Sequence, residues 1–196
     1  MQPMMEFEKA KRFILEKLDN ELPASLYYHN VGHVLDVYDS VVRHASAVGL
    51  DNEVATLLKT AALFHDSGFI IKAQGHEELS CAYAREFLPG FGYDETQISQ
   101  ICGMIMATKI PQSPKNALEE IMADADLDYL GRDDFFEISD NLYAELKKRG
   151  EVENENQWNV IQVKFFEQHQ YFTKTARELR QAKKMEHLEI IKSKIQ

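Results

Sequence analysis

The segment LLKTAALFHDSG, residues 57–68, indicates both the fold class and a candidate site. Its apolar residues predict a buried helix that ends in the adjacent polar pair His65 and Asp66. Two neighbouring polar side chains are costly to bury without partners, and a metal ion would satisfy both. Because adjacent helical residues point about 100° apart, one ion can bridge them only near a helix end. Asp66, Ser67 and Gly68 provide such an end.

Helical spacing of apolar residues continues along the rest of the chain, without a strand or hairpin pattern. We therefore predict an all-α fold. Asp94 with Gln97 resembles a capping box, Ser113 before Pro114 suits a cap and a first helical position, and the polar stretch 150–157 predicts a mobile loop before a C-terminal helical hairpin. The predicted helical segments are 6–22, 30–48, 52–66, 76–88, 95–108, 115–129, 133–149 and 155–190.

Composition limits the classes of partner. A chain of 196 residues with 44% hydrophobic residues suits one domain, which we expect to span residues 1–196. The net charge of -10, from 22 Lys and Arg against 32 Asp and Glu, argues against binding a nucleic acid polymer. A small anionic substrate would need local positive charge, for which a bound metal is the natural source.

Cysteine content and hydropathy predict a soluble, cytoplasmic protein. Cys81 and Cys102 each lie in an apolar helical pattern, which fits reduced core residues better than a disulfide framework. The opening residues 1–18 interleave charges with apolar residues, unlike a secretory signal. No later run reaches membrane-spanning length, so we expect no membrane contact.

A second segment with candidate ligands is YYHNVGHVLDV, residues 27–37. His29 and His33 are four positions apart, so their imidazoles share one face if the helix already includes His29. Pairs at this spacing also occur by chance, so the pair alone decides little.

The third segment is EEIMADADLDYLG, residues 119–131, which holds three aspartates among apolar residues. Ile121, Asp124 and Asp128 lie at helical spacing. This places Asp124 on the apolar face and Asp126 on a different, wetter one. We therefore predict Asp124 as the ligand from this segment.

The order His33, then His65 with Asp66, then Asp124 resembles the HD superfamily of metal-dependent phosphohydrolases. It is especially similar to small stand-alone predicted members, which share a YHNxxH opening, a helix ending in HD and a DADLxxLG segment. The resemblance covers about residues 27–131 as a metal-site core, with C-terminal helices over 132–196. It implies a helical bundle in which those four residues hold one divalent ion, and hydrolysis of a phosphate ester of a small metabolite or nucleotide.

The resemblance also implies roles around this ion. Asp66 and His29 are the predicted catalytic residues, because the first histidine of a comparable HNxxH motif in cyclic nucleotide phosphodiesterases acts as general acid. Bracing the helix start is the other interpretation of His29. Thr108 and Lys109 suit phosphate contact. His76 is a candidate for substrate contact, against the plainer role of a helix cap or surface residue.

Several alternatives stay open. Two-metal relatives carry two further histidines between the HD pair and the last aspartate, where this chain has only His76, which favours a single ion. The sequence does not choose among manganese, iron, cobalt, nickel, zinc and magnesium. A non-catalytic HD module that senses ligands or binds partners is the first alternative, and a dinuclear oxygenase is the second. The aromatic residues between 165 and 172 suit either a core or a homodimer contact.

Overall fold

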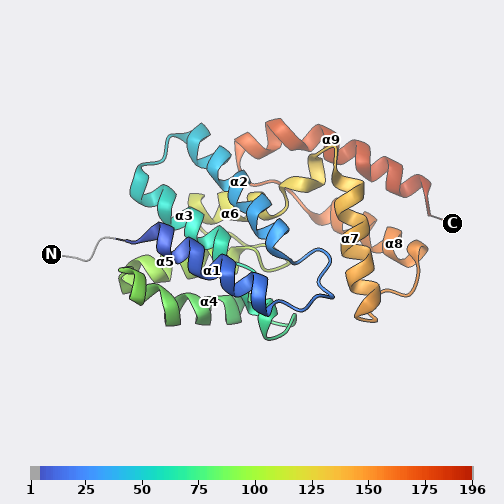
Figure 1. Cartoon of the computed structure of the whole chain (residues 1–196). Helices are drawn as coiled ribbons and strands as arrows, with labels where there is room; N and C mark the ends of the chain where they lie inside the picture. The colour runs from blue at the N-terminus through green and yellow to red at the C-terminus, as the bar shows by residue number, and fades with distance from the viewer. Residues whose placement is uncertain (1–4, 196) are drawn as a thin grey trace. The chain divides into compact units, whose positions relative to one another are not determined.

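The computed structural model describes residues 5–195, which form helices and no strand (Figure 1). The all-α prediction is confirmed. Part of the opening sequence interpreted above, residues 1–4, lies outside the described residues. The α-helices are α1 (Phe7–Glu21), α2 (Val31–Val48), α3 (Asn52–Phe64), α4 (His76–Phe87), α5 (Glu95–Ala107), α6 (Ala117–Asp126), α7 (Phe135–Lys148), α8 (Glu155–Gln168) and α9 (Lys174–Ser193). The short 3₁₀ helices are η1 (Ser67–Ile70), η2 (Leu88–Phe91) and η3 (Asp128–Gly131).

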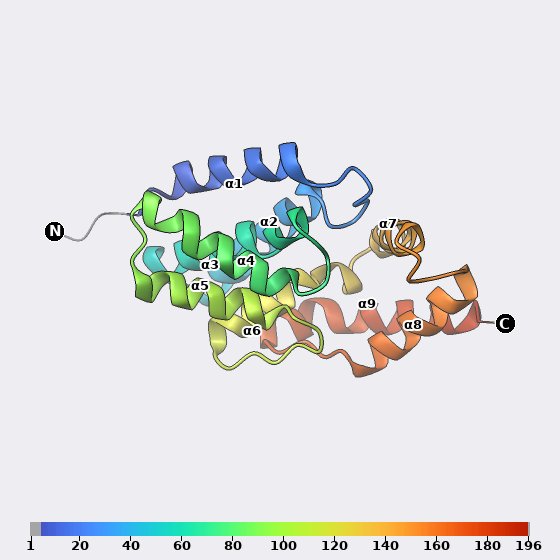
Figure 2. The ribbon, with the colours of Figure 1, turned by 90° about the horizontal axis from the view of Figure 1, so that it is seen from below.

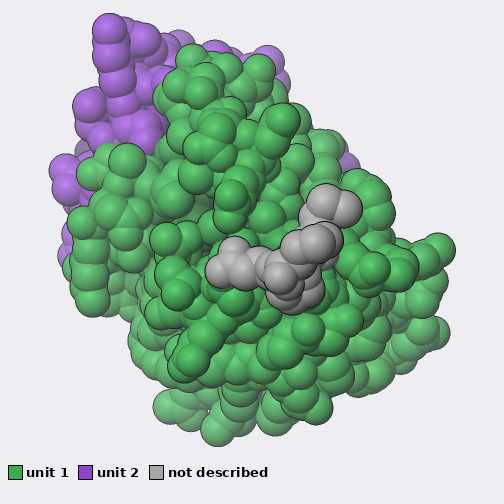
Figure 3. Space-filling model, turned by 90° about the vertical axis from the view of Figure 1, so that its left-hand side faces the viewer, with its two compact units in different colours: residues 1–23, 29–126 green, residues 24–28, 127–196 purple. Residues whose placement is uncertain are grey.

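The chain divides into two compact units (Figure 3). Unit 1 comprises residues 1–23 and 29–126, and unit 2 comprises residues 24–28 and 127–196. That the whole chain acts as one domain stays a prediction. None of the described helices is both long enough and apolar enough to cross a membrane.

Unit 1 is built around α3, which packs against α1, α2, α5 and α6 (Figure 2). The stretch from Thr60 to Phe64 is fully buried. The one polar side chain in that stretch, Thr60, is satisfied because its hydroxyl lies 2.8 Å from both the Thr56 carbonyl and the Tyr93 hydroxyl. The predicted buried helix is thus the centre of this unit.

The predicted helix boundaries hold where side chains cap the backbone. The capping box at the start of α5 is confirmed, since Asp94 accepts from the Gln97 backbone N–H and Gln97 accepts from the Asp94 N–H. The predicted cap at Ser113 is wrong. The helix predicted from residue 115 begins at Ala117, and the Asn116 side chain accepts hydrogen bonds from the Leu118 and Glu119 N–H groups.

Unit 2 contains η3 and helices α7 to α9. The segment 155–190 forms two helices that pack together, α8 and α9, as expected of a hairpin. The chain is extended at His169, and Thr173 caps α9 by accepting from the Ala176 N–H. Asp128 is buried and accepts two hydrogen bonds from the Arg180 guanidinium, at 2.7 and 3.0 Å.

Candidate metal centre

His65 ends the central helix with its imidazole oriented by the backbone. Its Nδ1 lies 2.8 Å from the carbonyl oxygen of Ala62. A carbonyl only accepts, so Nδ1 carries the hydrogen and, in the neutral ring, Nε2 presents a lone pair. The residue is completely buried. Fixing one ring nitrogen in this way leaves the other ready to bind a cation.

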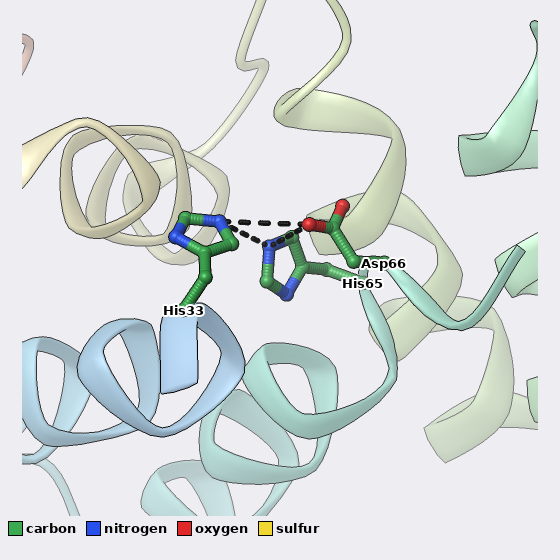
Figure 4. A group of neighbouring side chains, drawn as sticks. All are labelled: His33, His65 and Asp66. Atoms are coloured by element: carbon green, nitrogen blue, oxygen red, sulfur yellow. Dashed lines mark hydrogen bonds and ion pairs between the residues drawn. The ribbon is translucent and has the colours of Figure 1, made fainter. Parts of the chain in front are cut away.

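The side chains of His33 and Asp66 converge on the Nε2 of His65 (Figure 4). His33 Nε2, from the first turn of α2, lies 3.3 Å away. Asp66 Oδ2 lies 3.4 Å from His65 Nε2 and 3.5 Å from His33 Nε2. Asp66 follows α3 with φ -104° and ψ 7°, outside ideal helical values. This change of direction at the helix end lets two adjacent residues face one point.

Asp126 provides a second carboxylate that meets the two imidazoles. Its Oδ1 lies 3.2 Å from His33 Nε2 and 3.3 Å from His65 Nε2. The sequence placed Asp126 on a wetter face, and 15% of its side chain is exposed whereas Asp124 is fully buried. The greater exposure of Asp126 does not keep its carboxylate from meeting both imidazoles.

The predicted ligand Asp124 is fully buried in α6, and neither it nor Asp126 belongs to the His33, His65 and Asp66 group. Its position on the helix differs from that of Asp126, which is the last α-helical residue. The signal that could have indicated Asp126 is its place at the end of an apolar helix, which it shares with His65 and Asp66. Ligation by Asp124 stays a prediction.

The charges of this cluster favour a cation. Burial alone lowers the pKa of His65, but the carboxylates of Asp66 and Asp126 outweigh it and raise that pKa to about 9. Burial opposes ionisation of Asp126, yet hydrogen bonding to His33 and His65 lowers its pKa to about 2. The pKa of Asp66 is lowered as well, because the neighbouring imidazoles outweigh its burial. Two ionised carboxylates thus share one buried space.

A further histidine, His76, borders the cluster from the start of α4. Its Nδ1 lies 3.0 Å from the Ala73 carbonyl, and its Nε2 lies 3.3 Å from Asp66 Oδ1. His76 makes no side-chain cap, since Gly75 precedes the helix and no side chain accepts from its first N–H groups. The sequence favoured a cap or surface role, whereas the structure places this ring against a candidate ligand.

His29 lies just before α2, whose cap is Asn30, so the two histidines do not share a helical face as the spacing suggested. Their rings are nevertheless near, with centroids 6.0 Å apart. The sequence did not single out Phe69, on which the His29 ring stacks at 4.1 Å and near which the His76 ring lies at 4.2 Å. Phe69 is buried, and its ring lies against the imidazoles of both His29 and His76.

The turn after Asp66 is held tightly against α4. The Gly68 N–H donates to the Ser80 hydroxyl at 2.8 Å. A Cβ on Gly68 would overlap the carbonyl oxygen of His76. Glycine is required here by the close approach of two backbones.

The predicted phosphate contacts make protein contacts of their own. The Thr108 hydroxyl is buried and donates to the Ile105 carbonyl at 2.8 Å. Lys109 pairs with Glu78 at the exposed surface. Lys109 also lines a cavity of about 580 Å³ between α4, α5 and the following loop. Contact of either residue with a substrate stays a prediction.

Comparison with known proteins supports the fold. No protein-family model matches the chain, and no curated protein matches it. A predicted HD superfamily hydrolase from an uncultured Thermotogales bacterium is similar with TM-score 0.57 and 21% identity, over 96% of this chain and 88% of that one. Bacillus subtilis YpgQ, solved in complex with ADP, is similar with TM-score 0.65 and 20% identity, over 96% and 95% of the two chains. The chain therefore has the fold of an HD superfamily protein.

Proposed function

We propose that this chain is a metal-dependent hydrolase that cleaves a phosphate ester of a nucleotide or another small metabolite. The observation that carries the proposal is the convergence of His33, His65 and Asp66 on one buried point. The HD fold and the ADP bound to similar YpgQ support the chemistry and the substrate class.

The donor set fits a single divalent cation. Asp66 Oδ2 is buried and accepts no hydrogen bond from the described residues. Such an atom is costly unless a cation balances it. The His65 tautomer directs a lone pair at the same point, and mixed imidazole and carboxylate donors suit several divalent transition metals. We infer that Asp126 is the fourth ligand, in preference to Asp124.

The chain's own residues would orient the reaction. When bound, a divalent cation lowers the pKa of a coordinated water and polarises a phosphoryl oxygen. Asp66 holds its carboxylate between His65 and His76, which fixes its orientation. His29 is half-buried and stacked on Phe69, so it is accessible to a substrate and can give a proton to the leaving oxygen.

The test is a matched pair of conservative variants in the same helix, Asp126→Asn and Asp124→Asn. Metal content is measured by elemental analysis after metal exchange, and turnover is measured on a panel of nucleotides and sugar phosphates. We expect Asp126→Asn to lose metal and activity, and Asp124→Asn to retain both. The reverse result would assign the ligand to Asp124. Stoichiometric metal without turnover on any phosphoester would favour a non-catalytic HD module.

The role of His29 needs a separate comparison. In His29→Asn, hydrolysis of substrates with poor leaving groups should fall by about 10²-fold, since general acids contribute 10²–10⁴-fold. Hydrolysis of activated esters such as nitrophenyl phosphates should change little, because their leaving group needs no proton. Equal loss on both substrate types would reject the proton-donor role.

A further inference from the structure

The two cysteines of the chain meet across a helix pair. Cys81 lies in α4 and Cys102 in α5, which pack side by side (Figure 2). Cys81 Sγ lies 3.5 Å from the Cys102 carbonyl oxygen, and Cys102 Sγ lies 3.7 Å from the Cys81 carbonyl oxygen. Each sulfur therefore lies beside the other residue's backbone. This reciprocal contact requires close backbones, as a disulfide does.

Both thiols are buried and reduced, but one borders a cavity. Cys102 lines the space of about 580 Å³ described above, together with Arg85. The Arg85 side chain supplies a positive charge to the lining of this cavity. A hydrogen bond from the Cys81 thiol, aided by Arg85, lowers the pKa of Cys102 to about 7. The same contact raises the pKa of Cys81, so Cys102 is the thiol of the pair that ionises first.

We propose that Cys81 and Cys102 form a thiol pair that a hydroperoxide converts reversibly into an intramolecular disulfide linking α4 to α5. The proposal rests on the reciprocal contacts and on the cavity that Cys102 and Arg85 line together. It does not depend on the proposed hydrolase activity.

The chemistry is balanced. The Cys102 thiolate attacks one peroxide oxygen, so the O–O bond breaks, an S–O bond forms, and water or an alcohol leaves after protonation. The Cys81 sulfur then attacks the sulfenic sulfur, which forms the S–S bond and releases a second water. Two thiols lose two electrons and two protons, and one peroxide is reduced. A dithiol reductant reverses the modification.

The experiment uses the full chain treated with a small excess of hydrogen peroxide, then denatured with an alkylating reagent. We expect both thiols to escape alkylation in a monomer that is about 2 Da lighter, and a crosslinked peptide pair containing both cysteines. Dithiothreitol should restore both thiols. The same treatment in concentrated urea should form the bridge at least about tenfold more slowly, because the native contact is lost.

Single variants separate the two sulfurs, since the chain has only two cysteines. In Cys81→Ser, Cys102 should be trapped as a sulfenic acid by a dimedone reagent. In Cys102→Ser, Cys81 should react at least about tenfold more slowly. Circular dichroism checks that each variant folds. Two results with the wild-type protein would overturn the proposal. One is that both thiols survive peroxide treatment, and the other is that only disulfide-linked dimers form. Both can be observed without a variant.

Discussion

The fully buried His65 of unit 1 and the half-buried His169 of unit 2 face different groups. In unit 1, His65 faces the carboxylates of Asp66 and Asp126, and its pKa rises to about 9 despite its burial. In unit 2, Lys184 Nζ lies 3.0 Å from His169 Nδ1. Burial, and then this lysine, lower the pKa of His169 to about 3.

The contrast shows that the neighbours of a histidine decide its chemistry. The unit 1 cluster attracts positive charge, whether protons or a metal ion. The ring of His169 accepts a hydrogen bond from a lysine and resists gaining a proton. The removal of a histidine ring from water therefore does not by itself indicate a metal site. Substitutions in each of the two units can test this difference.

The largest effect should come from Asp66→Asn in unit 1. The change keeps the side-chain shape but removes the charge of a proposed ligand. We expect turnover to fall by about 10³-fold, equivalent to about 4 kcal/mol, because even residues that only support a ligand cost 10–100-fold. Activity and metal content are measured together. Full metal content with normal turnover would show that the Asp66 carboxylate is not a ligand. The proposed difference between the histidines of the two units would then be wrong.

The next effect concerns an aspartate in unit 2. Asp128→Asn removes one partner of the buried pair with Arg180. We expect about 3 kcal/mol of destabilisation in urea unfolding, since it leaves the guanidinium poorly compensated. Any metal bound at the unit 1 cluster should be retained. Loss of metal in a folded Asp128→Asn protein would show that the aspartates do not have separate roles.

A smaller effect is the pH dependence of Lys184. Burial lowers its pKa to about 8, below the ordinary value of 10.5. Between these values the unfolded chain binds more protons than the folded one, so the stability contributed by this residue rises with pH. Relative to Lys184→Met, the wild type should gain about 2 kcal/mol from pH 8 to 10.5. Urea unfolding of both proteins at the two pH values measures this gain in the free energy of unfolding. If the difference between wild type and Lys184→Met is the same at both pH values, burial does not lower the pKa of Lys184.

The smallest effect should come from His76→Gln. His76 touches Asp66 and is a positioning residue in this proposal. Because such supporting contacts typically change metal affinity by 10–100-fold, we expect about tenfold weaker metal binding with the fold intact. Titration of the metal-free protein measures the dissociation constant. An unchanged constant would restrict His76 to packing or substrate contact.

The sequence predicted the fold class well, because helical periodicity and capping are local properties. The Asp94 capping box and the buried helix before His65 both follow from residues within a few positions. The start of α6 was missed because Asn116 and Pro114 are both plausible helix-start signals, and the sequence does not rank them.

The candidate site was predictable as far as its ligands lie at the ends of apolar helices, whether at the start, as His33, or at the end, as His65 and Asp66. His33, His65 and Asp66 come together as the pattern suggested. The choice between Asp124 and Asp126 was not local, since it depends on where α6 ends and on a helix that is buried on almost every side. The contacts of His76 and Phe69 depend on the packing of η1 against α4, which no spacing rule describes.

The close contact at Gly68 makes the position of His76 a property of the main chain. Any larger residue at position 68 would push η1 away from α4. The Asp66 and His76 side chains, which these two elements position, would then move apart. The distance between these two side chains is therefore set by a residue without a side chain. A redesign of this centre would therefore tolerate substitution least at Gly68, although Gly68 is not one of the residues that carry the chemistry.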